Sequence, residues 1–103
     1  MIKVKSDNNV IEISGHANFD IYGKDIVCAS VSSIVTATVN YIMNIDNSSI
    51  RYLDDGKIIK IERINNNEIT KKILKTMIEL LKDLEKQYKE NIKIESEEWK
   101  CYF

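Results

Sequence analysis

The sequence predicts an α+β fold, a two-layer α/β sandwich in which two helices cover one face of a mainly antiparallel sheet. Four short segments alternate apolar and polar residues and form two pairs, each joined by turn-forming residues, which is typical of β-hairpins. Two longer segments repeat apolar residues at helical spacing. With a last short strand, these elements give the order ββαββαβ, and such a chain buries its apolar surface between two layers.

The first hairpin is predicted at residues 1–5 and 10–14, where apolar and polar residues alternate on either side of a Ser-Asp-Asn-Asn turn. The segment 16–23 that follows has no clear period and contains one glycine, Gly23. We therefore expect a loop between this hairpin and the next element.

The first helix is predicted to begin after Asp25, whose carboxylate suits an N-cap, and to run to about Asn44. Its apolar residues form one stripe and most of the others are small, so we expect two buried faces. The stretch 26–45 is apolar enough to be considered as a membrane span, but the Ser, Thr and Asn residues across its middle favour a buried helix. The stripe consists of Val27, Val31, Ile34, Val35, Thr38 and Ile42.

The second hairpin is predicted at residues 50–53 and 57–63, which flank the turn formed by Asp54, Asp55 and Gly56. An Asp-Gly turn between two alternating segments is a strong local hairpin signal.

The second helix is predicted to start with a capping box, in which Asn65 is followed three residues later by Glu68. Residues 92–95 alternate again and predict a last strand, before an aromatic tail at 99–103. The helix carries an apolar stripe opposite a face rich in Lys and Glu, and the stripe consists of Ile69, Ile73, Met77, Leu80, Leu81, Leu84 and Tyr88.

The 103 residues are enough for one core, so we expect residues 1–103 to form a single domain. Its 15 Lys and Arg residues against 16 Asp and Glu residues leave a net charge of −1. This balance gives no general attraction to nucleic acid or to an anionic membrane, and we expect neither as a direct partner.

The segment that joins the first hairpin to the first helix carries the candidate chemistry. His16, the only histidine, lies just beyond a predicted strand, and Cys28 lies in the first turn of the predicted helix. A cysteine peptidase needs a thiolate, which a helix N-terminus and a nearby imidazolium favour, and an imidazole that protonates the leaving amine. Cys28 is therefore the candidate nucleophile, and His16 the candidate general acid and base.

Three neighbouring residues are candidates for supporting roles. Asp25 lies on the same side of the helix as Cys28, where it either caps the helix or also orients His16. Ser32 follows Cys28 by one turn on that side, and Gly15 lets the chain bend tightly beside the histidine.

Two further features of the segment would serve catalysis. Free backbone N–H groups of Cys28 and Ala29 are candidate donors to the oxyanion that forms on a substrate carbonyl. The loop between the histidine and the cysteine, with Phe19, Tyr22 and Gly23, is the candidate substrate loop and would fold over a bound peptide as a lid.

Each of these residues also has a structural interpretation, and the spacing alone leaves both open. Cys28 suits a small core position on an apolar helix, and a lone histidine is often structural. Asp25 suits a plain N-cap, and Phe19 suits simple packing. Cys101, in the apolar tail, is expected to be unreactive.

A longer pattern is more specific than the Cys and His pair. The run Gly15-His16-Ala17, a loop, and then Gly23-x-Asp25-Ile-Val-Cys28-Ala29-x-Val31-Ser32 resembles the signature of the Prp family, the ribosomal-processing cysteine proteases. The chain length, the element order and the Asp-Gly hairpin are similar too, so the resemblance spans essentially the whole chain. It implies a catalytic dyad of Cys28 and His16, with Gly15, Asp25 and Ser32 at matching positions.

The resemblance also implies what the enzyme acts on. Members of this family are endopeptidases that remove a short N-terminal extension from a large-subunit ribosomal protein, cutting after an aromatic residue, in Firmicutes and related bacteria. It further implies a homodimer, a loop between histidine and cysteine that is mobile in the free enzyme, and no cofactor or metal.

Two other classes of function stay open as alternatives. A metal site would draw on His16, Asp25, Cys28 and Cys101, but closely spaced ligand pairs are lacking. A non-catalytic ribosome-associated binding module would dock a basic tail on the acidic residues Asp54, Asp55, Glu95, Glu97 and Glu98.

Cysteine content predicts the compartment. Two cysteines are too few for a disulfide framework, and no signal peptide precedes the first strand pattern. We therefore expect free thiols in a reducing, cytoplasmic environment.

Overall fold

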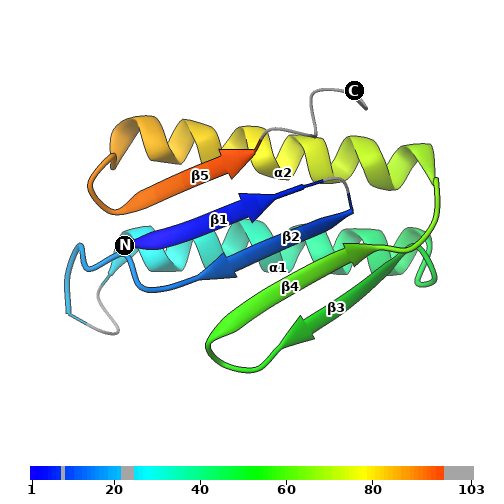
Figure 1. Ribbon diagram of the computed structural model, residues 1–103, viewed down its shortest axis with the longest axis horizontal. Helices are drawn as coiled ribbons and strands as arrows, with labels where there is room; N and C mark the ends of the chain where they lie inside the picture. Colours follow the sequence, from blue (N-terminus) through cyan, green and yellow to red (C-terminus); the bar gives the residue numbers. More distant parts are fainter. Residues whose placement is uncertain (8, 22–24, 97–103) are drawn as a thin grey trace.

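The elements follow the predicted order in the computed structural model, which describes residues 1–7, 9–21 and 25–96. Figure 1 shows them along the chain. They are β1 (Ile2–Ser6), β2 (Val10–Ser14), α1 (Ile26–Ile45), β3 (Ile50–Asp54), β4 (Ile58–Arg63), α2 (Glu68–Gln87) and β5 (Ile92–Ser96).

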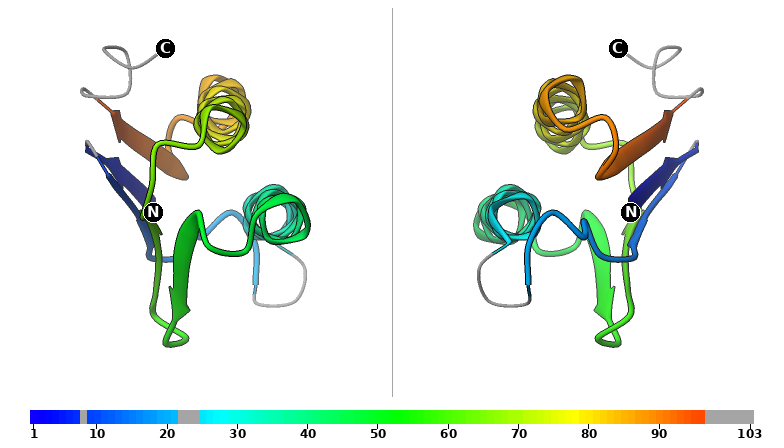
Figure 2. Two further views of the ribbon diagram at one scale, coloured as in Figure 1. Left: turned by 90° about the vertical axis from the view of Figure 1, so that its right-hand side faces the viewer. Right: turned by 90° about the vertical axis from the view of Figure 1, so that its left-hand side faces the viewer.

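The strands form one five-stranded sheet in the order β3-β4-β2-β1-β5. Three of its four pairings are antiparallel, as predicted, and the fourth is a parallel pairing of β1 with β5. Both helices lie side by side on the same face of this sheet (Figure 2). The predicted two-layer α+β sandwich is therefore confirmed.

The core lies between the sheet and the helix layer. Alternation in β1 buries Ile2 and Val4, and helical spacing in α2 buries Leu74 and Leu81 against the same cluster. The buried stripe of α1 consists of Val27, Val31, Val35, Val39 and Ile42.

The expectation that α1 has two buried faces is wrong. Tyr41, Met43 and Ile45 are exposed, because the helices form a single layer whose outer side is uncovered among the described residues. By length and composition, α1 is also the one described helix that is apolar enough to cross a membrane. In this fold it is a core helix, with its valine stripe buried.

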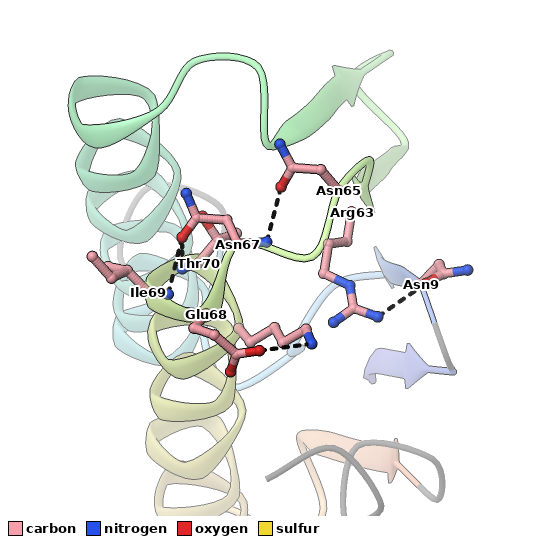
Figure 3. Close-up of polar contacts among 8 residues, drawn as sticks. Asn9, Arg63, Asn65, Asn67, Glu68, Ile69 and Thr70 are labelled. Atoms are coloured by element: carbon pink, nitrogen blue, oxygen red, sulfur yellow. Dashed lines mark hydrogen bonds and ion pairs between the residues drawn. The ribbon is translucent and has the colours of Figure 1, made fainter.

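The capping box predicted for α2 assigns the N-cap to the wrong residue, Asn65. The N-cap is Asn67, whose Oδ1 accepts hydrogen bonds from the N–H groups of Ile69 and Thr70 at 2.9 and 3.1 Å (Figure 3). Asn65 instead accepts a hydrogen bond from the Asn67 N–H at 3.0 Å and shapes the turn before the helix. Either asparagine suits a cap by type, and the one with extended backbone next to the first helical residue takes the role.

Candidate active site

A cleft with a volume of about 790 Å³ lies where β2 ends and α1 begins. The two predicted catalytic residues, His16 and Cys28, both line it. So do the three predicted supporting residues, Gly15, Asp25 and Ser32. The structure thus brings together all five residues that the sequence pattern had grouped.

Cys28 lies in the first turn of α1 and is half-buried. Its Sγ accepts a hydrogen bond from the backbone N–H of Ala17 at 3.3 Å. A thiolate is a stronger acceptor than a thiol, and the N-terminus of a helix also favours negative charge. Both features would stabilise the negative charge of a thiolate formed at this position.

His16 is exposed and follows β2 through Gly15, which has a φ of 86°. A Cβ atom at position 15 would collide with the Met1 carbonyl oxygen, so the chain passes the start of β1 too closely for any other residue. Within the described part of the chain, no hydrogen bond joins the His16 ring to Cys28 or Asp25. His16 lines the same cleft as Cys28, and the residue after it, Ala17, donates its N–H to Cys28 Sγ.

Asp25 is buried and holds four backbone N–H groups. Its Oδ1 accepts from Val27 and Cys28, both at 3.0 Å, and its Oδ2 accepts from Phe19 at 2.9 Å and Asp20 at 3.4 Å. Burial raises the pKa of this carboxyl, but the four donors together outweigh burial and hold the pKa below 3.8. Asp25 is the predicted N-cap of α1, and it also ties the preceding loop to that helix.

The predicted oxyanion donors are wrong in this structure. The Cys28 N–H donates to Asp25 Oδ1, and the Ala29 N–H donates to the Asp25 carbonyl oxygen at 3.0 Å. The first N–H groups of a helix need partners, and here the cap residue supplies them. Neither group is free to bind a substrate carbonyl.

The predicted substrate loop is described in part. The Phe19 ring makes an edge contact with Tyr88, with ring centroids 5.3 Å apart, and Phe19 is not among the residues that line the cleft. Tyr22 and Gly23 lie outside the described residues, as does Cys101. A substrate role for the loop stays a prediction.

Sequence reasoning missed the β3–β4 hairpin as part of the site. Asp54, Gly56 and Lys57 line the cleft, although they are far from Cys28 in sequence. Antiparallel pairing of β2 with β4 sets Ser14 opposite Ile58, which brings the hairpin turn beside the end of β2. Local patterns predict each hairpin but give no signal for this pairing between them.

The lining provides apolar and charged surface for a peptide. Ile2, Ile13, Val31 and Ile59 give it an apolar part, while Asp20, Asp54 and Lys57 add charges to the lining. Within the described residues, no three His, Cys, Asp or Glu side chains come together to hold a metal ion. The arrangement is that of a peptide-sized cleft with a thiol beside a helix N-terminus.

Known proteins share this sequence and fold. The family model described as the cysteine protease Prp matches residues 1–93. The ribosomal processing cysteine protease Prp of Staphylococcus aureus is 35% identical over 98 residues, which is 90% of this chain and 92% of that protein. The corresponding protein of Bacillus subtilis is 28% identical over 93 residues, covering 81% of this chain and 80% of that one.

Solved structures give the same result. The S. aureus protease Prp with a covalently linked product peptide has a TM-score of 0.84 at 33% identity, covering 94% of this chain and 100% of that one. Its complex with a substrate peptide has a TM-score of 0.81 at 31% identity, with the same coverage. Similarity thus extends over the sheet, both helices and the cleft.

Proposed function

The chain belongs to the family of the cysteine protease Prp and is a cysteine peptidase, and on that premise we propose that it removes a short N-terminal extension from a large-subunit ribosomal protein. In this proposal Cys28 is the nucleophile and His16 the general acid and base. The observation that carries this proposal is that His16 and Cys28 line one cleft. The residue after His16, Ala17, also donates its backbone N–H to Cys28 Sγ.

The proposed reaction is two acyl transfers. The Cys28 thiolate attacks the carbonyl carbon of the scissile bond, and the protonated His16 ring gives its proton to the leaving amine as the C–N bond breaks. A thioester then joins the N-terminal fragment to Cys28. Water attacks that carbonyl while His16 takes its proton, the C–S bond breaks, and the thiolate is restored.

Two properties of the cleft support a ribosomal substrate. The apolar part of the lining gives a place for the aromatic residue expected before the cut. Carboxylates outnumber basic side chains in the lining, with Asp20, Asp25 and Asp54 against Lys57 and His16. That sign of charge suits the basic sequence of a ribosomal protein.

A cleavage assay on the host's own N-terminally extended ribosomal protein tests the proposal. We expect the wild-type protein to shorten the substrate by one defined mass, and Cys28→Ser and His16→Ala to leave it intact, because removing either member of a catalytic unit costs nearly as much as removing both. Cys101→Ser is the matched control and should cleave normally. Cleavage by Cys28→Ser would refute the mechanism, and tight binding without cleavage by the wild type would favour a binding module.

We further propose that the protein is a cytoplasmic homodimer. A groove of about 590 Å³ runs between the two helices and is lined by Ile26, Ile34, Leu80 and Leu84 among others. With the exposed apolar residues of α1, it supports pairing of the helix layers of two copies. Light scattering of the wild-type protein and of a Leu80→Lys variant checks this proposal, which predicts a wild-type dimer that the added charge weakens. A wild-type monomer at assay concentration would contradict it.

A further inference from the structure

We propose that Asn91, which lies between α2 and β5, is a positioning residue of the catalytic centre. Its side-chain amide fixes the peptide segment that presents the Ala17 N–H to the Cys28 thiol. The inference rests on the proposed role of Cys28 as nucleophile, and it assigns a distant asparagine to holding the N–H that hydrogen-bonds to that nucleophile.

The contacts form a short chain through Ala17. The Ala17 N–H donates to Cys28 Sγ at 3.3 Å, and the Ala17 carbonyl oxygen accepts from Asn91 Nδ2 at 2.9 Å. The Ala17 side chain is itself buried, with 1% of its surface exposed. Ala17 is thus held by its N–H, its carbonyl and its methyl group, and the contact to the carbonyl comes from a residue 74 positions away in the sequence.

Backbone geometry shows why the carbonyl needs a partner. The next residue, Asn18, has a φ of 56°, a left-handed conformation that is uncommon for residues with a Cβ but that asparagine adopts more readily than most. Asn91 Nδ2 holds the peptide group before Asn18, and Asp25 Oδ2 holds the one after it, through the Phe19 N–H at 2.9 Å. The turn is therefore clamped from both sides.

Asn91 is well placed to act as one side of this clamp. Its N–H donates to the Tyr88 carbonyl at 2.9 Å, and its carbonyl accepts from the Ile2 N–H at 2.8 Å. The Phe19 ring packs on Tyr88 in the same turn. Figure 1 shows this α2–β5 turn at the same end of the molecule as the loop after β2. The amide is thus rigidly attached to both the sheet and α2.

Loss of the Asn91 amide should release the donor to sulfur. The Ala17 carbonyl would lose its partner, the left-handed turn at Asn18 would lose one of its two holds, and the Ala17 N–H would leave Cys28 Sγ. The thiolate would then lack its directed backbone donor, while the cleft lining would keep its residues. Asn91→Leu is nearly isosteric, removes the amide donor and adds no charge near the thiol.

The test is the pH profile of Cys28 alkylation by iodoacetamide, with Cys101 in the same molecule as internal reference. For Asn91→Leu we expect the midpoint of the Cys28 profile to move upward by on the order of one pH unit, since a hydrogen bond to a charged group contributes a free energy of that size. Cleavage at neutral pH should fall about tenfold through kcat, with little change in KM.

Asn67→Ala is the matched control, because it removes another asparagine with a structural hydrogen bond, at the start of α2. It should lower the melting temperature without moving the Cys28 profile. Asn91→Ser, which is also uncharged, replaces Asn91→Leu if the latter does not fold, and rates are compared at temperatures where circular dichroism shows each variant folded.

An unchanged Cys28 profile in the Asn91 variant would overturn the inference, even if its stability falls as in the control. If the profile is unchanged but the wild type cleaves the substrate and Cys28→Ser does not, the proposed function stands and only the role of Asn91 is removed. A shifted profile in a protein that does not cleave the ribosomal substrate would keep the positioning role and remove the substrate.

Discussion

At the scale of single residues, the site depends on which side-chain atoms accept hydrogen bonds from the backbone N–H groups around Cys28. Asp25 takes the N–H groups of Val27 and Cys28 on one oxygen and those of Phe19 and Asp20 on the other. With these donors engaged, the N–H that reaches the sulfur comes from Ala17, in the segment that follows β2. One carboxylate therefore caps the helix and anchors the loop, while the donor to the thiol comes from the segment before the helix.

The charge state of Asp25 should be visible in the pH dependence of stability. Its pKa is lowered in the folded protein, so its contribution is full above the unfolded value of about 3.8 and is lost as the pH falls through the folded pKa. We expect Asp25→Asn to flatten the decline of the unfolding free energy below about pH 4, measured by urea titration. Asp83→Asn, on the exposed side of α2, is the control, and equal slopes in both variants would contradict the assignment.

The two thiols should differ in reactivity. Cys28 has the Ala17 N–H and the N-terminus of α1 to favour its thiolate, whereas the sequence around Cys101 offers only the neighbouring Lys100. We expect iodoacetamide to alkylate Cys28 at least about tenfold faster than Cys101 near neutral pH, as counted by peptide mass spectrometry. Equal rates in the native protein would weigh heavily against a catalytic Cys28.

At the scale of elements, the helix layer is held at the end away from the cleft by a small polar network. Asp46, the C-cap of α1, accepts from Asn67 Nδ2 at 2.9 Å and from the Ser48 hydroxyl at 2.6 Å. Asn67 in turn caps α2. The end of one helix and the start of the other thus share a single side-chain contact, which fixes their relative position.

This network predicts unequal effects for two nearby asparagines. Asn67→Ala should lower the unfolding free energy by about 1 kcal/mol or somewhat more, because it removes the cap of α2 and the contact with Asp46. Asn65→Ala should cost less, since its exposed side chain accepts one hydrogen bond in the preceding turn and contacts Asp46 but caps no helix. Chemical denaturation of both variants measures the difference, and a larger loss for Asn65→Ala would restore the capping box predicted from sequence.

At the scale of the whole molecule, the sequence predicts what depends on neighbours along the chain. Alternation, helical spacing and the cap at Asp25 predict every described element, and the Cys and His motif predicts five residues of one cleft. Long-range contacts carry no such local signal. Asn91 reaches Ala17 across 74 positions, and nothing in its immediate sequence marks it as part of the site.

The sheet order is the long-range feature that completes the cleft. Pairing of β2 with β4 places the turn after β3 beside the residues that follow β2. Asp54 lines the cleft there, while its Oδ1 accepts from the Gly56 N–H at 2.9 Å. Asp55 is not among the lining residues and turns its carboxylate to the N–H groups of Lys57 and Ile58, both at 2.8 Å. Two adjacent carboxylates in one turn thus face different surroundings.

That difference gives a test of the hairpin as a wall of the substrate site. Asp54→Asn removes a charge from the cleft but keeps the oxygen that accepts from Gly56, so the turn should persist. For a basic ribosomal substrate we expect KM to rise about two- to fivefold with little change in kcat, which is the size of an exposed charge contact. The effect should shrink at high salt, because added ions screen the attraction.

Asp55→Asn is the matched control and should change KM less, since its charge lies outside the lining. Equal effects of the two variants would mean that the hairpin acts only through its overall charge, and no effect of either would remove it from substrate binding.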